Sequence, residues 1–105
     1  MKLLLQVAAI LICAGALASA GAQKGADVYK KNCAMCHGAT GDANTPVGQK
    51  FKVPPFASEE VLKQSDESML AIVKNGKDKM PAWKDKLSEG QIKDLVAFVH
   101  TLQKK

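Results

Sequence analysis

Two cysteines separated by two residues, with a histidine directly after the second, constrain this chain more than any other feature of its sequence. The stretch KNCAMCHGATGD contains them as Cys33, Cys36 and His37. Sulfur and nitrogen donors in this spacing can hold a metal ion, act as a dithiol switch or anchor a larger group. The choice among these decides what the rest of the chain has to provide.

The first twenty residues are expected to be an export signal rather than part of the folded domain. Lys2 precedes an apolar run from about Leu3 to Leu17, and the small residues Ala18–Ala20 follow it. This pattern is typical of a secretory signal peptide with cleavage after Ala20. An uncleaved anchor is the alternative, but the run is shorter than the roughly 20 residues that a spanning helix needs. The sequence therefore predicts residues 1–20 as signal peptide and residues 21–105 as one domain.

The predicted domain is small and basic. Its 85 residues can rarely build a large core unaided, so we expect another component to fill the centre of the fold. Without Lys2, 14 lysines face 10 acidic residues, which gives a net charge of +4, and the chain has no arginine. Because arginine supplies the forked donors that recognise phosphates and base edges, and because the chain is exported, nucleic acid is not an expected partner.

Caps and periodicity predict helices and no strands. A first helix is expected from Lys24 to about Ala34, and two short helices after the N-cap residues Ser58 and Ser65. The segment Thr40–Pro55 is rich in proline and glycine and is expected to be a loop. No stretch alternates in β-branched residues with a period of two, so the sequence predicts an all-α domain.

The last predicted helix has the clearest signals. It is expected to run from about Ser88 to Leu102, with apolar residues in helical spacing. Ser88 and Gln91 have the spacing of a capping box.

The motif fits neither a dithiol switch nor a structural zinc site. A thioredoxin-like dithiol needs strands around it, which the sequence lacks. Structural zinc needs four ligands, and the domain adds only the distant His100 to the motif. A disulfide between Cys33 and Cys36 would close a tight loop and leave His37 unexplained.

Cys-x-x-Cys-His is instead the attachment signature of c-type haem. In such a site both thiols form thioethers with the porphyrin, and the adjacent histidine binds the iron. We therefore expect one covalent haem c on Cys33 and Cys36, with His37 as the proximal iron ligand. The porphyrin would also supply the missing apolar core.

The second axial ligand of the iron is expected to be Met80. Among the other candidates, Met35 lies inside the attachment loop, Met69 belongs to an apolar helical stripe, and His100 stands near a chain end. Met80 follows a helix stop and directly precedes Pro81, which favours an extended conformation. A methionine on such a loop can cover the ring.

These residues together resemble the class I c-type cytochromes, in particular the small monohaem members of bacteria and photosynthetic organisms. The resemblance covers nearly the whole domain through the stretches GADVYKKNCAMCHG, KMPAW and LSEGQIKDLVAFVHTL. It implies that the first and last helices cross, with Gly25, Tyr29, Leu95 and Phe98 at the crossing.

The resemblance also implies further contacts to the haem. A loop proline carbonyl holds the proximal imidazole in this family, and Pro46, nine residues after His37, is the expected match, with Pro54 and Pro55 as alternatives. Trp83 is expected to pack on a haem propionate, to hydrogen-bond to it, or to serve in packing alone.

An iron held by His37 and Met80 has no open coordination position, and the thioether ligand raises the reduction potential. We therefore expect a soluble, monomeric carrier of single electrons that is not an enzyme. It would be exported to the periplasm, or to the thylakoid lumen in a photosynthetic organism, without stable membrane insertion after cleavage. Two alternatives remain open: an electron-entry haem subunit of a larger oxidoreductase, and a haem peroxidase if Met80 does not bind the iron.

The expected partners are donor and acceptor redox proteins. Four lysines bracket Met80 in the sequence: Lys77, Lys79, Lys84 and Lys86. If Met80 covers the haem, these lysines would form a positive collar suited to an acidic partner.

Overall fold

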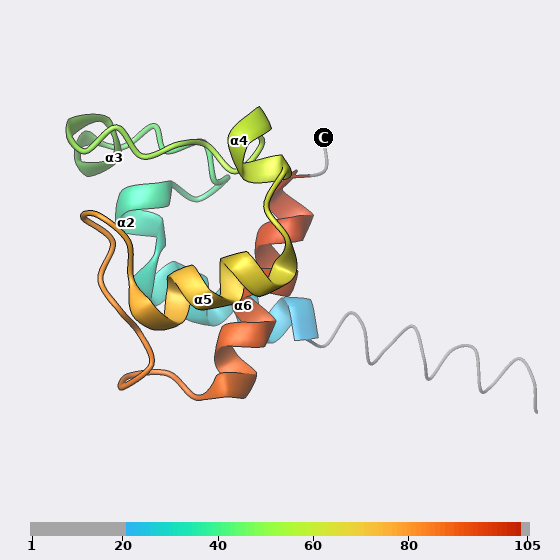
Figure 1. Cartoon of the computed structure of the whole chain (residues 1–105). Helices are drawn as coiled ribbons and strands as arrows, with labels where there is room; N and C mark the ends of the chain where they lie inside the picture. Colours follow the sequence, from blue (N-terminus) through green and yellow to red (C-terminus); the bar gives the residue numbers. More distant parts are fainter. Residues whose placement is uncertain (1–20, 104–105) are drawn as a thin grey trace, which may run out of the picture.

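The computed structural model describes residues 21–103, and the regular elements in this range are helices (Figure 1). An N-terminal helix is described from residue 21 to residue 32. The helices that follow are α2 (Ala34–His37), α3 (Pro46–Lys50), α4 (Glu59–Leu62), α5 (Asp66–Asn75) and α6 (Glu89–Gln103). The all-α prediction is confirmed for the described residues. The signal-peptide prediction for residues 1–20 lies outside them.

The N-terminal helix crosses α6 at a glycine (Figure 1). A Cβ atom on Gly25 would lie 2.1 Å from the backbone oxygen of Asp94 and 3.0 Å from the Cβ of Phe98. Next to this contact, the ring centroids of Tyr29 and Phe98 are 5.1 Å apart. Leu95 is buried beside them. The predicted crossing is confirmed, and it requires glycine because any larger residue would push the two backbones apart.

Serine caps fix the starts of the two longest helices after the motif. In α5, the Ser65 hydroxyl accepts a hydrogen bond from the Ser68 amide at 3.1 Å. In α6, the Gln91 amide donates to the Ser88 hydroxyl at 3.1 Å, and the Ser88 amide donates to the Gln91 side chain at 2.8 Å. This reciprocal pair is the predicted capping box. Ser58 stands at the N-cap of α4, but its hydroxyl makes no cap bond and is buried without a partner among residues 21–103.

The segment predicted as a loop, Thr40–Pro55, contains the helix α3, so that part of the prediction is wrong. The Thr45 hydroxyl accepts a hydrogen bond from the Gly48 amide at 2.9 Å, which caps the helix. Pro46 occupies the first helical position, where its fixed φ angle favours the helix and its missing N–H costs nothing. Proline usually interrupts a helix, but at this position it begins one.

The buried apolar core is small, as the length of the domain implies. Its members are Tyr29, Ala43, Val61, Met69, Ile92, Leu95 and Val96. Met69 packs with Val61 and Val96 in one cluster, which confirms its prediction as a core residue. Within the described part of the chain, no helix combines the length and apolar character needed to cross a bilayer.

Candidate functional site

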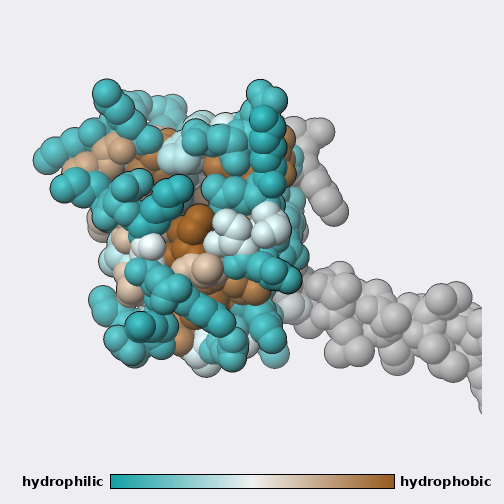
Figure 2. All heavy atoms as spheres, viewed as in Figure 1, coloured by the Kyte–Doolittle hydropathy of each residue, from teal (hydrophilic) through white to brown (hydrophobic). Residues whose placement is uncertain are grey.

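A cavity of about 500 Å³ lies between the cysteine–histidine motif and the segment that follows α5. The predicted ligands Cys33, Cys36, His37 and Met80 all line it. Much of the wall is apolar and comes from several elements: Phe51, Val53, Phe56, Val61, Met69, Ile72, Val73, Leu95, Val96 and Val99. Figure 2 shows hydrophobic residues in a hollow between groups of hydrophilic side chains. An apolar cavity with sulfur and nitrogen donors in its wall fits a large, flat, apolar cofactor.

The motif occupies one turn of helix, which places its three donors close together. The Cys33 amide donates to the Tyr29 carbonyl at 2.8 Å, and the His37 amide donates to the Cys33 carbonyl at 3.0 Å. Both thiols are free and partly buried. Burial, with a smaller effect from the neighbouring Cys36, raises the pKa of the Cys33 thiol to about 11. A dithiol switch needs a lowered thiol pKa, so this environment argues against thiol–disulfide exchange at Cys33.

The imidazole of His37 lies flat against the ring of Phe56. The two ring centroids are 4.7 Å apart and the planes differ by 20°. Burial lowers the pKa of His37, which keeps the ring neutral and able to bind a metal through a nitrogen lone pair. The other feature of this ring is its Nδ1 atom, which is buried without a hydrogen-bond partner among the described residues.

The bond expected from Pro46 to His37 is therefore not formed in this structure. Pro46 is exposed at the start of α3 and does not line the cavity. Its segment is tied to the motif by a different group, because the Thr45 hydroxyl donates to the Cys36 carbonyl at 3.0 Å. Of the two alternatives, Pro54 lines the cavity.

Met80 stands in a tight turn rather than in an open loop. The Lys77 amide donates to the Met80 carbonyl at 3.1 Å, and the Met80 amide donates to the Lys77 carbonyl at 2.8 Å. The turn follows Gly76, whose φ of 81° ends α5. A Cβ on Gly76 would lie 2.8 Å from the Met80 carbonyl oxygen, so this position also needs glycine for close approach. These contacts set the backbone of Met80 at the edge of the cavity.

Comparison with known proteins identifies the family. Residues 20–99 match the family model described as cytochrome c oxidase, cbb3-type, subunit III. The cbb3-type cytochrome c oxidase subunit CcoP of Azospirillum brasilense is 37% identical over 86 residues, which cover 80% of this chain and 29% of that protein. Cytochrome c6 of Bryopsis maxima is 38% identical over 80 residues, which cover 71% of this chain and 84% of that protein. The chain belongs to the small class I c-type cytochromes.

A solved structure supports the same assignment for this cytochrome. The KustC0563 c-type cytochrome has a TM-score of 0.70 and 32% sequence identity, and the match covers 76% of this chain and 98% of that one. Family membership gives this cytochrome a covalently bound haem c with iron. The cytochrome spans less than a third of CcoP but most of cytochrome c6.

The lysines expected around Met80 divide into two groups in this cytochrome. Lys77 and Lys79 line the cavity, whereas Lys84 and Lys86 do not. The Lys86 ammonium lies 5.3 Å from the ring centroid of Trp83, which itself lines the cavity. The structure therefore brings Trp83 to the predicted site and leaves half of the predicted collar away from the cavity wall.

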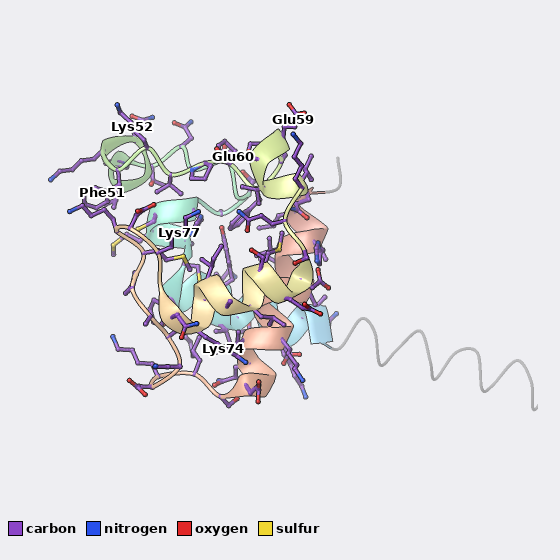
Figure 3. All side chains as sticks on the ribbon, in the orientation of Figure 1. Phe51, Lys52, Glu59, Glu60, Lys74 and Lys77 are labelled. Carbon is purple, nitrogen blue, oxygen red and sulfur yellow. The ribbon has the colours of Figure 1, made fainter. Side chains whose placement is uncertain are left out.

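Two further lysines were not anticipated from the sequence. Lys31 and Lys52 also line the cavity, together with the acidic residue Glu60. Figure 3 shows Lys52 and Lys77 with Phe51 on the side of the molecule where α3 and the Met80 turn lie. Lys31 could have been found from its place just before the motif, whereas Lys52 follows α3 and lies far from the motif along the chain.

The aromatic contacts of the site were also missed. Phe51 is 40% exposed, and the ammonium groups of Lys50 and Lys79 lie 5.6 and 6.0 Å from its ring centroid. Phe56 stacks on His37 and contacts Tyr29, with 6.2 Å between the ring centroids. The sequence shows that aromatic residues are present but not which of them face the motif.

Proposed function

We propose that this cytochrome carries single electrons between redox proteins and catalyses no reaction of its own. The observation that carries the proposal is the one cavity shared by Cys33, Cys36, His37 and Met80. When bound, haem c supplies an iron centre that gains and loses one electron. The two thiols attach it, and the imidazole of His37 and the thioether of Met80 are the proposed axial ligands.

The proposed ligands also explain why we expect no oxygen or peroxide chemistry. With both His37 and Met80 bound to it, the iron would have no position left for oxygen or peroxide. The soft thioether of Met80 would favour Fe(II) and so raise the reduction potential. Two backbone hydrogen bonds close the Met80 turn, which limits how far this ligand moves when the charge at the site changes.

The surface around the cavity supports an acidic partner. Four of the lining residues are lysines, Lys31, Lys52, Lys77 and Lys79, against two acidic residues, Glu60 and Asp78. A positive rim of this kind steers an acidic protein toward the cavity and increases the rate of encounter. We also propose that the protein is exported to the periplasm or thylakoid lumen, as the pattern of residues 1–20 indicates, and that it acts there as a soluble monomer.

Two measurements on the purified holoprotein test the proposal. Haem should remain with the polypeptide in acidified organic solvent, because thioether bonds survive this treatment and axial bonds do not. The visible spectrum of the reduced protein should be unchanged by carbon monoxide. Extraction of the haem would exclude attachment through Cys33 and Cys36, and rapid binding of carbon monoxide would exclude Met80 as a stable ligand and favour the peroxidase alternative.

The second candidate is a haem module that works inside a larger oxidase. The observation that favours it is the match to the cbb3-type subunit family and to CcoP, an oxidase subunit. The match to cytochrome c6 favours the free carrier, because it covers 84% of that small protein. Gel filtration of material from the native cells separates the two, because a carrier elutes as a small single chain and a module elutes with an oxidase complex.

A further inference from the structure

The ring of Phe51 lies at the mouth of the cavity, between the end of α3 and the Met80 turn. Phe51 lines the cavity, yet 40% of the residue is exposed. Figure 3 shows it where the end of α3 approaches the tip of the turn that follows α5. Phe51 therefore belongs both to the wall of the cavity and to the molecular surface.

On one side, Phe51 is tied to the attachment motif. The Phe51 amide donates to the Val47 carbonyl at 3.0 Å, at the end of α3. The helix α3 packs closely on the motif, because a Cβ atom on Gly48 would collide with the Cys36 carbonyl oxygen. The Thr45 hydroxyl donates to this same oxygen at 3.0 Å. The wall of the cavity that carries Phe51 is thus fixed to the segment that carries the cysteines.

On the other side, Phe51 contacts the residue next to the proposed distal ligand. The ammonium of Lys79, which directly precedes Met80, lies 6.0 Å from the ring centroid of Phe51. The ammonium of Lys50 lies 5.6 Å from the same centroid, but Lys50 belongs to α3 itself. Both distances are within the range in which an ammonium is attracted to an aromatic ring. Of these two contacts, that of Lys79 connects α3 to the Met80 turn.

The backbone on each side of this contact adopts an unusual conformation. Among residues 21–103, three non-glycine residues have a positive φ angle, and two of them are Lys52, at 55°, and Asp78, at 53°. Lys52 directly follows Phe51, and Asp78 directly precedes Lys79. A positive φ is unfavourable for residues with a side chain, and such residues concentrate at functional sites. Both turns thus accept a strained residue where they bring Phe51 and Lys79 together.

We propose that Phe51 closes this side of the cavity by joining its two walls. Through Lys79, its ring holds the Met80 turn against α3, and its bulk keeps water away from the bound haem. Phe51 is thus a positioning residue for Met80 and not a ligand of the iron. The proposal rests on the proposed role of Met80 as an axial ligand.

Each role of Phe51 has a measurable consequence. Carbon monoxide binds to the reduced haem only after the Met80 thioether has left the iron, so a looser turn should bind the gas faster. Oxidation of the iron adds a positive charge that water stabilises, so access of water should lower the reduction potential. The first effect depends on the contact with Lys79, and the second depends on an apolar side chain at position 51.

Rates of carbon monoxide binding to the reduced holoprotein test the contact between the walls. Lys79→Gln removes the ammonium, and Phe51→Leu removes the aromatic ring but keeps an apolar side chain. Each variant should bind the gas about two to five times faster than the wild type, the factor that a cation–π contact at an exposed site supplies. The double variant should be no faster than the faster single variant, because the contact can be lost only once.

Lys50→Gln is the matched control for these rates. It removes the same charge beside the same ring, but Lys50 and Phe51 are neighbours in the chain, so their contact joins no separate segments. This variant should bind carbon monoxide at the wild-type rate. An equal acceleration in Lys50→Gln, or effects that multiply in the double variant, would overturn the proposed link between the walls.

Potentiometric titration of the holoprotein tests the exclusion of water. Phe51→Ser admits water and should lower the reduction potential, whereas Phe51→Leu keeps the cavity covered and should stay close to the wild type. Leu62→Ser is the control, because Leu62 of α4 is 55% exposed and does not line the cavity. Its potential should not change. A wild-type potential in Phe51→Ser would overturn this role of Phe51.

Failure of the proposed function gives a different result. If Met80 does not bind the iron, the wild type itself binds carbon monoxide rapidly and the substitutions at positions 51 and 79 do not change the rate, which refutes both proposals. If the wild type binds the gas slowly and these variants match it, Met80 remains the ligand and only the link through Phe51 is refuted.

Discussion

The phenol of Tyr29 donates a hydrogen bond to the carbonyl oxygen of Gly38, nine residues further along the chain. Tyr29 precedes the motif and Gly38 follows it, so this bond joins the two segments that flank Cys33–His37. Burial raises the pKa of Tyr29, which keeps the phenol protonated and able to donate. The bond is thus maintained over the whole physiological pH range.

Removal of this hydroxyl should therefore destabilise the protein. Tyr29→Phe leaves the Gly38 carbonyl buried without its partner, and we expect a loss of about 1–3 kcal/mol in the free energy of unfolding of the holoprotein. Urea unfolding followed by circular dichroism measures it. Thr101→Val is the control, because it removes an exposed hydroxyl bond to the Phe98 carbonyl and should cost much less. Equal losses in the two variants would mean that the Tyr29 bond has no special role.

A methyl group at Gly76 should disturb the Met80 turn. The backbone of Gly76, with φ 81° and ψ 169°, is a conformation that other residues adopt only at a cost of order 1–3 kcal/mol. Gly76→Ala should lower stability by at least this amount and should speed the binding of carbon monoxide to the reduced haem, because Met80 is displaced.

The matched control for this change is Gly90→Ala. Gly90 lies in the first turn of α6, and the nearest heavy atom to an added Cβ is 3.9 Å away. Alanine there should stabilise the helix by up to about 1 kcal/mol and leave the spectrum unchanged. Similar gas-binding rates in the two variants would show that Gly76 does not position Met80.

Met69 and Met80, two of the methionines that line the cavity, should respond differently to substitution. Met80→Ala removes the proposed axial ligand, so the reduced haem should bind carbon monoxide and the reduction potential should fall. Met69→Leu conserves volume at a buried site and should cost less than about 1.5 kcal/mol with an unchanged spectrum. A spectrum controlled by Met69 instead would reassign the ligand.

Charge reversal at the cavity rim should slow electron transfer to an acidic partner. Lys77→Glu or Lys79→Glu should reduce the bimolecular rate on the order of 10-fold at low salt, and should weaken its dependence on ionic strength. Stopped-flow measurements with the native partner provide the rate. Lys24→Glu makes the same change of net charge at an exposed site away from the cavity and should have a small effect. Equal effects at all three positions would mean that the partner senses net charge alone.

The parts of the site that were predicted from the sequence are formed by residues that lie close together along the chain. The motif from Cys33 to His37 fits within one helical turn, so its spacing alone brings the donors together. The capping box likewise joins two residues that are only three positions apart, Ser88 and Gln91. The crossing at Gly25 was available only through resemblance to a family, because nothing local indicates what a glycine faces.

The parts that were missed depend on contacts between distant segments. Phe56 reaches His37 through its bonds to Gly41 and Gln103, and no spacing rule connects these positions. The Pro46 expectation failed for a related reason, since the residue is used to begin α3 and is exposed. A proline at this position can begin a helix, or it can offer its carbonyl oxygen to the imidazole of His37. The sequence alone did not distinguish these two roles.

The crossing of the N-terminal helix with α6 also bears on the order in which the protein can mature. The haem-binding motif lies near the start of the described chain, whereas the residues that pack on Gly25 and Tyr29 belong to its last helix. Bringing such distant segments together carries a loop-closure cost before any contact repays it. In the export that we propose, the N-terminal part would emerge first, so both thiols would be presented before α6. Haem attachment would then act on an open site, and the cavity would close only when α6 packs on the N-terminal helix.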